Sequence, residues 1–186
     1  MREPTAYHLK DEEFIIDPLD QVHVHRRFNE VVSSLGEESK NTWGFFWTIT
    51  PKNNKATWES CNAIAEGVVK KLTRKLWRRK SQYHQLRSIR AIETKDTRAH
   101  VHGITLVQID DLKQYHSQED ISKMIEKIAY DFHEVNRSHK YKDRPPVMVK
   151  PFIYFDDPSN RSSGDQAGTY IKYICKTANH TNNPLA

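Results

Sequence analysis

Short apolar stretches rich in aromatic and β-branched residues recur along the chain and predict β-strands. The first of them, TWGFFWTIT, stops at Pro51, and the fourth contains Pro151, which indicates an edge strand or a bulge. The turn-like sequence KDTR separates the second stretch from the third, so these two should form a hairpin. The four predicted strands span residues 42–50, 86–94, 99–108 and 147–155.

Between and after these strands, apolar residues recur at intervals of three and four, which is the spacing of one buried helix face. Thr57 is the expected N-cap of the first helix. Ser117, with Asp120 three positions later, has the pattern of an N-cap for the second. Helices are predicted over residues 57–80, 117–136 and 166–176.

From residue 42 onward the predicted order is strand, helix, strand, strand, helix, strand and helix. This order favours an α+β fold of the ferredoxin-like or RRM-like kind, in which helices pack on a mainly antiparallel sheet. Residues 1–40 are polar, carry nine acidic against five basic residues, and contain one short helical pattern. We therefore expect an acidic N-terminal appendage over residues 1–40 and one domain over residues 41–186.

The net charge of +5 conceals one strongly basic segment. Residues 67–98 carry eleven Lys and Arg against two acidic residues, which indicates a polyanionic partner. A solvated helix face is the alternative interpretation. If the partner is a nucleic acid, its phosphates should lie along this helix or along the basic loop SHKYKDRPP. The candidate side chains are Lys70, Lys71, Arg74, Arg78, Arg79, Lys140 and Arg144.

Several features bear on the compartment. No stretch approaches the roughly 18 apolar residues of a membrane-spanning helix, and the first residues lack the apolar core of a signal peptide. A cytoplasmic location without membrane association is therefore expected. Cys61 and Cys175 form no metal-binding spacing, which fits a reducing environment and argues against structural zinc.

The sequence His-Val-His occurs twice, and the predicted elements decide which pair can bind a metal. His23 and His25 precede a helical pattern, where residues two apart point about 200° away from each other and cannot share an ion. His100 and His102 fall on a predicted strand, where residues two apart share one face about 7 Å from each other. The second pair is therefore the candidate metal site.

Two neighbouring residues complete this hypothesis. In a hairpin that turns near residues 95–98, Glu93 should lie opposite His100 and could supply a carboxylate ligand. Gly103 lacks a side chain, so we expect it to leave room for a ligand. Two imidazoles and one carboxylate with open positions are typical of a catalytic metal site. A pair of hydrogen-bonded strand histidines without metal is the alternative.

The last predicted helix carries two tyrosines. Tyr170 falls on the apolar stripe with Ala167 and Ile174, so its ring is expected to pack against the sheet. Tyr173 lies at the edge of the stripe, one turn before Lys176, and could reach a site.

Three motifs now follow one another along the chain: the aromatic strand FFWTITPK, then HVHG with an upstream IE, and finally YIKYICK. This arrangement resembles the HUH endonuclease superfamily and, within it, the rolling-circle replication initiators (Rep proteins) of small phages and plasmids. The resemblance covers about residues 42–178.

The resemblance implies a metal-dependent nickase and ligase that acts on single-stranded origin DNA in the cytoplasm of a prokaryotic host. His100 and His102 would bind Mg²⁺ or Mn²⁺ with Glu93 as third ligand, and the ion would polarise the scissile phosphate. Tyr173 would attack that phosphate, forming a 5′-phosphotyrosine and releasing a 3′-OH. Lys176 would stabilise the phenolate or the phosphate.

The chain also departs from the family pattern. Initiators with two nucleophiles usually space their tyrosines four apart, whereas Tyr170 and Tyr173 are three apart, which favours Tyr173 as a single nucleophile. The sequence contains no G-x-x-x-x-G-K-[ST] motif, so unwinding would fall to a separate helicase and synthesis to a polymerase.

Two other functions stay open at this stage. A relaxase or a transposase would share the same chemistry, although relaxases usually carry a third histidine in the metal motif. A non-catalytic, RRM-like nucleic-acid-binding domain would instead stack bases on the alternating side chains of Trp43, Phe45 and Trp47. Core packing is the more ordinary role for these three aromatic rings.

Overall fold

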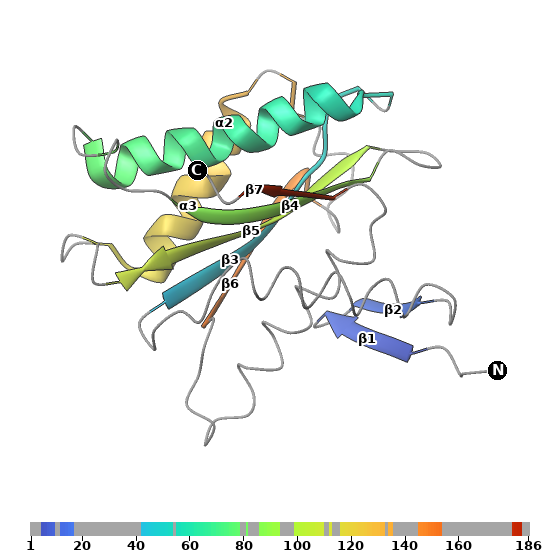
Figure 1. Cartoon of the computed structure of the whole chain (residues 1–186), viewed down its shortest axis with the longest axis horizontal. Coiled ribbons are helices and arrows are strands. Elements are labelled where there is room, and N and C mark those ends of the chain that lie inside the picture. The colour runs from blue at the N-terminus through green and yellow to red at the C-terminus, as the bar shows by residue number, and fades with distance from the viewer. Residues whose placement is uncertain are drawn as a thin grey trace.

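The computed structural model of the chain (Figure 1) shows an antiparallel sheet with two helices packed on it. The residues that it describes are 5–9, 12–16, 42–53, 55–78, 81, 86–93, 99–109, 112, 116–132, 134–135, 145–153 and 180–183.

The sheet has five antiparallel strands in the order β6-β3-β5-β4-β7. All four predicted strands are present, with ends within two residues of the prediction, and β4 and β5 form the predicted hairpin. Pro151 lies on β6, which is an edge strand as predicted, the place in a sheet where proline is tolerated. The strands are β3 (Thr42–Ile49), β4 (Arg87–Glu93), β5 (His100–Gln108), β6 (Val147–Ile153) and β7 (His180–Asn183).

Three strands were not predicted. The edge strand β7 has the polar sequence HTNN and therefore none of the apolar alternation by which a strand is found. Within the predicted appendage, β1 (Thr5–Leu9) and β2 (Glu12–Ile16) pair as a separate two-stranded antiparallel sheet. The helical pattern predicted before residue 36 and the helix predicted over residues 166–176 lie outside the described residues.

The first helix, α2 (Trp58–Trp77), begins as predicted at its N-cap Thr57, whose hydroxyl accepts a hydrogen bond from the Ser60 N–H. The second, α3 (Gln118–Tyr130), begins at the predicted cap, where Ser117 and Asp120 form a reciprocal capping box. These side-chain hydrogen bonds lower the pKa of the Asp120 carboxyl. Neither helix in this part of the chain is long and apolar enough to cross a membrane.

The prediction that α3 would continue to residue 136 was wrong. The helix ends at Tyr130, and the chain then turns so that Val135 forms a β-bridge with Pro51 at the end of β3. The ring of Phe132 occupies the space that a Cβ on Gly67 would fill, which lets α3 approach α2 closely. Tertiary contacts of this kind override the helical periodicity that continues through Phe132.

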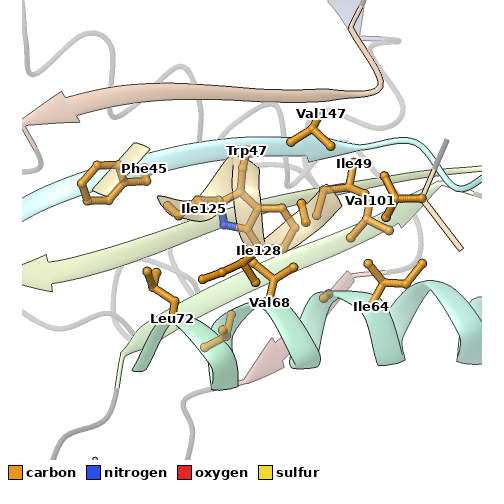
Figure 2. Close-up of a cluster of buried hydrophobic side chains, with 14 of the residues drawn as sticks. Phe45, Trp47, Ile49, Ile64, Val68, Leu72, Val101, Ile125, Ile128 and Val147 are labelled. Carbon is orange, nitrogen blue, oxygen red and sulfur yellow. The ribbon is translucent and has the colours of Figure 1, made fainter. Parts of the chain in front are cut away.

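The main core lies between the sheet and the two helices (Figure 2). Phe45, Trp47 and Ile49 point from β3 toward α2 and α3 and are fully buried. Core packing is thus the role of Phe45 and Trp47, as expected for aromatic residues that alternate along a central strand. Their partners include Ile64, Val68 and Leu72 of α2, Val101 of β5, and Ile125 and Ile128 of α3.

The opposite face of the sheet is also apolar and buried. Successive side chains of a strand point to opposite faces of the sheet. Phe46, the neighbour of Trp47 along β3, therefore faces this side, and the register places buried Ile, Leu and Phe residues of β4, β5 and β6 on the same face. At most 4% of each of these residues is exposed, so both faces of the sheet are covered. They are Phe46, Ile89, Ile104, Leu106 and Phe152.

A buried arginine joins β4 to α2. Arg90, only 3% exposed, donates from Nε to Asn62 Oδ1 at 2.7 Å and from Nη2 to Glu66 Oε1 at 2.9 Å. Burial lowers the pKa of Arg90, and the charge of Glu66 opposes that shift. Both hydrogen bonds and the opposite charge compensate the cost of burying the guanidinium, so this contact fixes the helix against the strand.

Trp47 packs directly over Gly103 of the neighbouring strand. A Cβ on Gly103 would collide with the indole ring, whose Nε1–H donates to Thr105 Oγ1 at 3.0 Å. The expectation that Gly103 leaves room for a ligand was therefore wrong. The space beside it belongs to the tryptophan, on the face of the sheet that the helices cover.

We predict that Gly103→Ala lowers the free energy of unfolding by roughly 1–3 kcal/mol, because the added methyl overpacks a ring held by its own hydrogen bond. Urea denaturation measures the effect as a lower midpoint. A Gly103→Ala/Trp47→Phe double variant should lose less than the sum of the two single losses, since the smaller ring makes room for the methyl. An unchanged midpoint in Gly103→Ala would contradict this packing.

Candidate metal-binding site

His100 and His102 lie on the central strand β5, on the face of the sheet away from α2 and α3. The register shows this placement, since Val101 and Gly103 pair with Ile49 and Trp47 on the helix side, while His102 pairs with Thr48. His102 is 4% exposed and His100 is partly buried. The predicted common face of the two histidines is thus confirmed.

Each imidazole lies against a threonine hydroxyl from β3 or its end. Thr48 Oγ1 is 2.9 Å from His102 Nδ1, and Thr50 Oγ1 is 3.2 Å from His100 Nδ1. In the tautomer in which Nδ1 donates to the threonine, Nε2 carries the lone pair that binds a metal. Each threonine hydroxyl thus limits the rotation of the imidazole ring that it contacts.

The positions of the two rings suit a shared ligand. Their centroids are 6.1 Å apart with planes tilted by 31°, and Phe46 stacks on His102 at 6.0 Å with planes 8° apart. Because a bound metal lies about 2.1 Å from a ligating nitrogen, rings at this spacing can approach one ion from two sides. Phe46 and Thr48 together restrict rotation of the buried His102 ring.

Glu93 is the residue directly paired with His100 in the β4–β5 register. Directly paired residues of antiparallel strands share a face, so this position lies on the histidine face as predicted. The Glu93 side chain itself is outside the described part of the structure. Among the side chains that are described, no group of three or more His, Cys, Asp or Glu residues forms a cluster.

The remaining predicted site residues fall into two sets. Those outside the described residues are Arg79, Lys140, Arg144, Tyr173 and Lys176. The three residues that were predicted to take no part, His23, His25 and Tyr170, also lie outside the described residues. The described ones, Lys70, Lys71, Arg74 and Arg78, belong to α2 or its C-cap and so lie on the helix side of the sheet. The structure thus brings His100, His102 and Glu93 to one face and separates the basic helix from them.

Thr48 and Thr50 were not identified from the sequence. They share a face because they are two residues apart, and this alternation is visible in the TIT sequence. Their pairing with the histidines depends on the register between β3 and β5, which lie more than fifty residues apart in the chain. A threonine two residues from another on a strand is too common to indicate a metal site.

Comparisons of the chain with protein-family models, with curated proteins and with solved structures give no match.

We predict that His102→Ala and His100→Ala each weaken Mn²⁺ binding at least tenfold, because each variant removes a nitrogen ligand. Isothermal titration calorimetry measures the affinity. His116→Ala, which removes a histidine just before α3, should bind Mn²⁺ like the parent. If His102→Ala binds as tightly as the parent while remaining folded, the histidine pair serves only the packing of the sheet.

Removal of the hydroxyl of Thr48 should weaken Mn²⁺ binding by about 10–100-fold, since loss of the hydrogen bond that orients a ligating histidine typically has that effect. Thr48→Val keeps the shape of the side chain and leaves both histidines in place. Thr42→Val is the matched control on the same strand, because the buried Thr42 hydroxyl has no hydrogen-bond partner among the described residues. Equal affinities in the two variants would mean that Thr48 does not orient a metal ligand.

Proposed function

We propose that this chain is an HUH-type endonuclease that nicks and rejoins single-stranded DNA at a replication origin. The observation that carries the proposal is the pair His100 and His102, on one face of the central strand, with each Nδ1 against a threonine hydroxyl. Glu93 at the paired position of β4 supports a third, carboxylate ligand. The ferredoxin-like strand order is compatible with this function but does not by itself imply any activity.

In this proposal His100, His102 and Glu93 hold a divalent ion, Mg²⁺ or Mn²⁺. Once bound, the ion supplies Lewis-acid polarisation of the scissile phosphate. Two imidazoles and one carboxylate leave coordination positions for phosphate oxygens. Thr48 and Thr50 keep the imidazole rings oriented, so little reorganisation is needed when DNA binds.

The nucleophile in this proposal is Tyr173. Its phenolic oxygen forms a bond to the scissile phosphorus, and the bond from phosphorus to the 3′ oxygen breaks. The leaving 3′ oxygen takes up a proton, while the phosphate stays on Tyr173 as a 5′-phosphotyrosine. Lys176 stabilises the phenolate, whose ordinary pKa near 10 would otherwise keep the tyrosine protonated. Attack by a 3′-OH reverses the step and rejoins the strand.

A non-catalytic, RRM-like nucleic-acid-binding domain is the second candidate. Phe45 and Trp47, which would have served as stacking platforms, are fully buried under the helices. Bases cannot reach rings in that position, so these two residues do not form the stacking platform that this candidate requires. A relaxase or a transposase would use the same chemistry, and the gene neighbourhood would distinguish them from a replication initiator.

The partners follow from the reaction. The substrate is single-stranded origin DNA in the cytoplasm of a prokaryotic host, and the freed 3′-OH serves a polymerase. In this proposal a helicase unwinds the duplex.

We predict that Tyr173→Phe abolishes the covalent protein–DNA adduct and retains DNA affinity, because only the attacking oxygen is lost. The adduct is measured on a denaturing gel after incubation with labelled single-stranded oligonucleotides and Mn²⁺. Tyr170→Phe is the matched control and should form the adduct nearly as well as the parent. EDTA should prevent adduct formation in every variant.

If the adduct persists in Tyr173→Phe and disappears in Tyr170→Phe, the roles of the two tyrosines are exchanged. If the parent binds DNA but forms no adduct with any oligonucleotide in Mn²⁺, the non-catalytic binding domain replaces the endonuclease.

A further inference from the structure

The C-terminal half of α2 presents a cationic surface. Lys70, Arg74, Lys75 and Arg78 are all exposed, and residues 67–78 contain no acidic residue. At 3.6 residues per turn these four side chains fall on one arc of the helix, opposite the buried stripe that contains Leu72 and Leu76. We name these four residues the α2 basic face. From Lys70 to Arg78 the helix rises about 12 Å, so the four charges form a row along roughly two turns of one helix.

The α2 basic face and the histidine pair lie on opposite sides of the sheet. The buried stripe of α2 packs on the face that carries Trp47, whereas His100 and His102 occupy the other face. The thickness of a helix, about 10 Å, and that of the sheet therefore separate the cations from the imidazoles. A nucleic-acid segment bound to the α2 basic face is not the segment that lies over the histidines.

Arg78 has a backbone conformation that is unusual for a residue other than glycine. Arg78 is the C-cap of α2, with φ 50° and ψ −119°, and its N–H donates to the carbonyl oxygen of Arg74. Positive φ at a helix end is the ordinary place of glycine, and an arginine there carries backbone strain. A cation at a position where glycine would be more stable is consistent with a role for the charge itself.

We propose that the α2 basic face binds the phosphate backbone of duplex DNA that flanks the single-stranded segment. Proteins that bind single strands usually combine cations with exposed aromatic rings on which bases stack. Trp77, which lies next to Arg78 on the same helix, instead packs against the core. Among the described residues the row of cations thus has no exposed aromatic ring of α2 beside it, which suits a charged backbone, and duplex DNA has the higher density of phosphates.

The identity of the polyanion rests on the proposed function, but the binding measurement needs neither metal nor catalysis. Anisotropy of a labelled duplex, recorded in EDTA between about 50 and 200 mM salt, gives the slope of log affinity against log salt. Lys70→Gln/Arg74→Gln should reduce that slope by about two, at roughly 0.9 for each lost phosphate contact. Lys55→Gln/Lys123→Gln removes the same charge from two exposed lysines outside the row and should leave the slope nearly unchanged.

Adduct formation on a short single-stranded oligonucleotide separates the two proposals. It is measured on the parent protein and needs no substitution in the α2 basic face. A parent that forms no adduct but shows the duplex effect would overturn the proposed endonuclease and keep this surface. Equal slopes in the two double variants, or an equal loss of single-strand affinity, would overturn the assignment to duplex DNA.

Arg78→Gly provides a second variant with opposite effects on stability and binding. Glycine relieves the positive φ, so the melting temperature should rise by roughly 2–4 °C. The salt slope for duplex DNA should fall by about one, since one cation is lost. A more stable variant with an unchanged slope would contradict the inference.

Discussion

The register between β3 and β5 is the constraint on which the core and the candidate site both depend. Because strand side chains alternate, this register places Trp47 over Gly103 on one face and Thr48 beside His102 on the other. A slip of one residue would turn the tryptophan away from the helices and the histidines toward them. The indole ring fits only where its neighbour lacks a Cβ, so the largest side chain of the core also fixes the position of the histidines.

The two faces of the sheet carry different sets of polar residues. On the helix side lie the aromatic core and Arg90, whose hydrogen bonds to Asn62 and Glu66 hold α2 in place. On the other side His102 is only 4% exposed, and Ile104, two residues further along β5, is fully buried on the same face. An imidazole held in this way by a hydroxyl and a stacked ring has few orientations open to it. On the outer side of α2 the cations of the basic face lie apart from both the core and the histidines.

The features that were predicted correctly are those that depend on residues close together in the chain. The β3, β5 and α2 patterns were predicted correctly because aromatic alternation and spacings of three and four report which face of an element is buried. Ser117 and Asp120 predicted the start of α3, since a capping box needs only neighbouring residues. The polar strand β7 and the end of α3 were missed because both depend on partners distant in the chain. Thr48 and Thr50 were missed for the same reason.

By itself, the sequence determined the positions of most elements, the shared face of His100 and His102 and the place of Glu93 near them. These features follow from local periodicity and from a hairpin whose strands are close in the chain. Only the tertiary structure decided that Gly103 accommodates Trp47, that threonines from β3 orient the imidazoles, and that the basic helix faces away from them. These three features depend on residues that are distant in the sequence and adjacent in space. Local sequence patterns do not predict which distant residues come together.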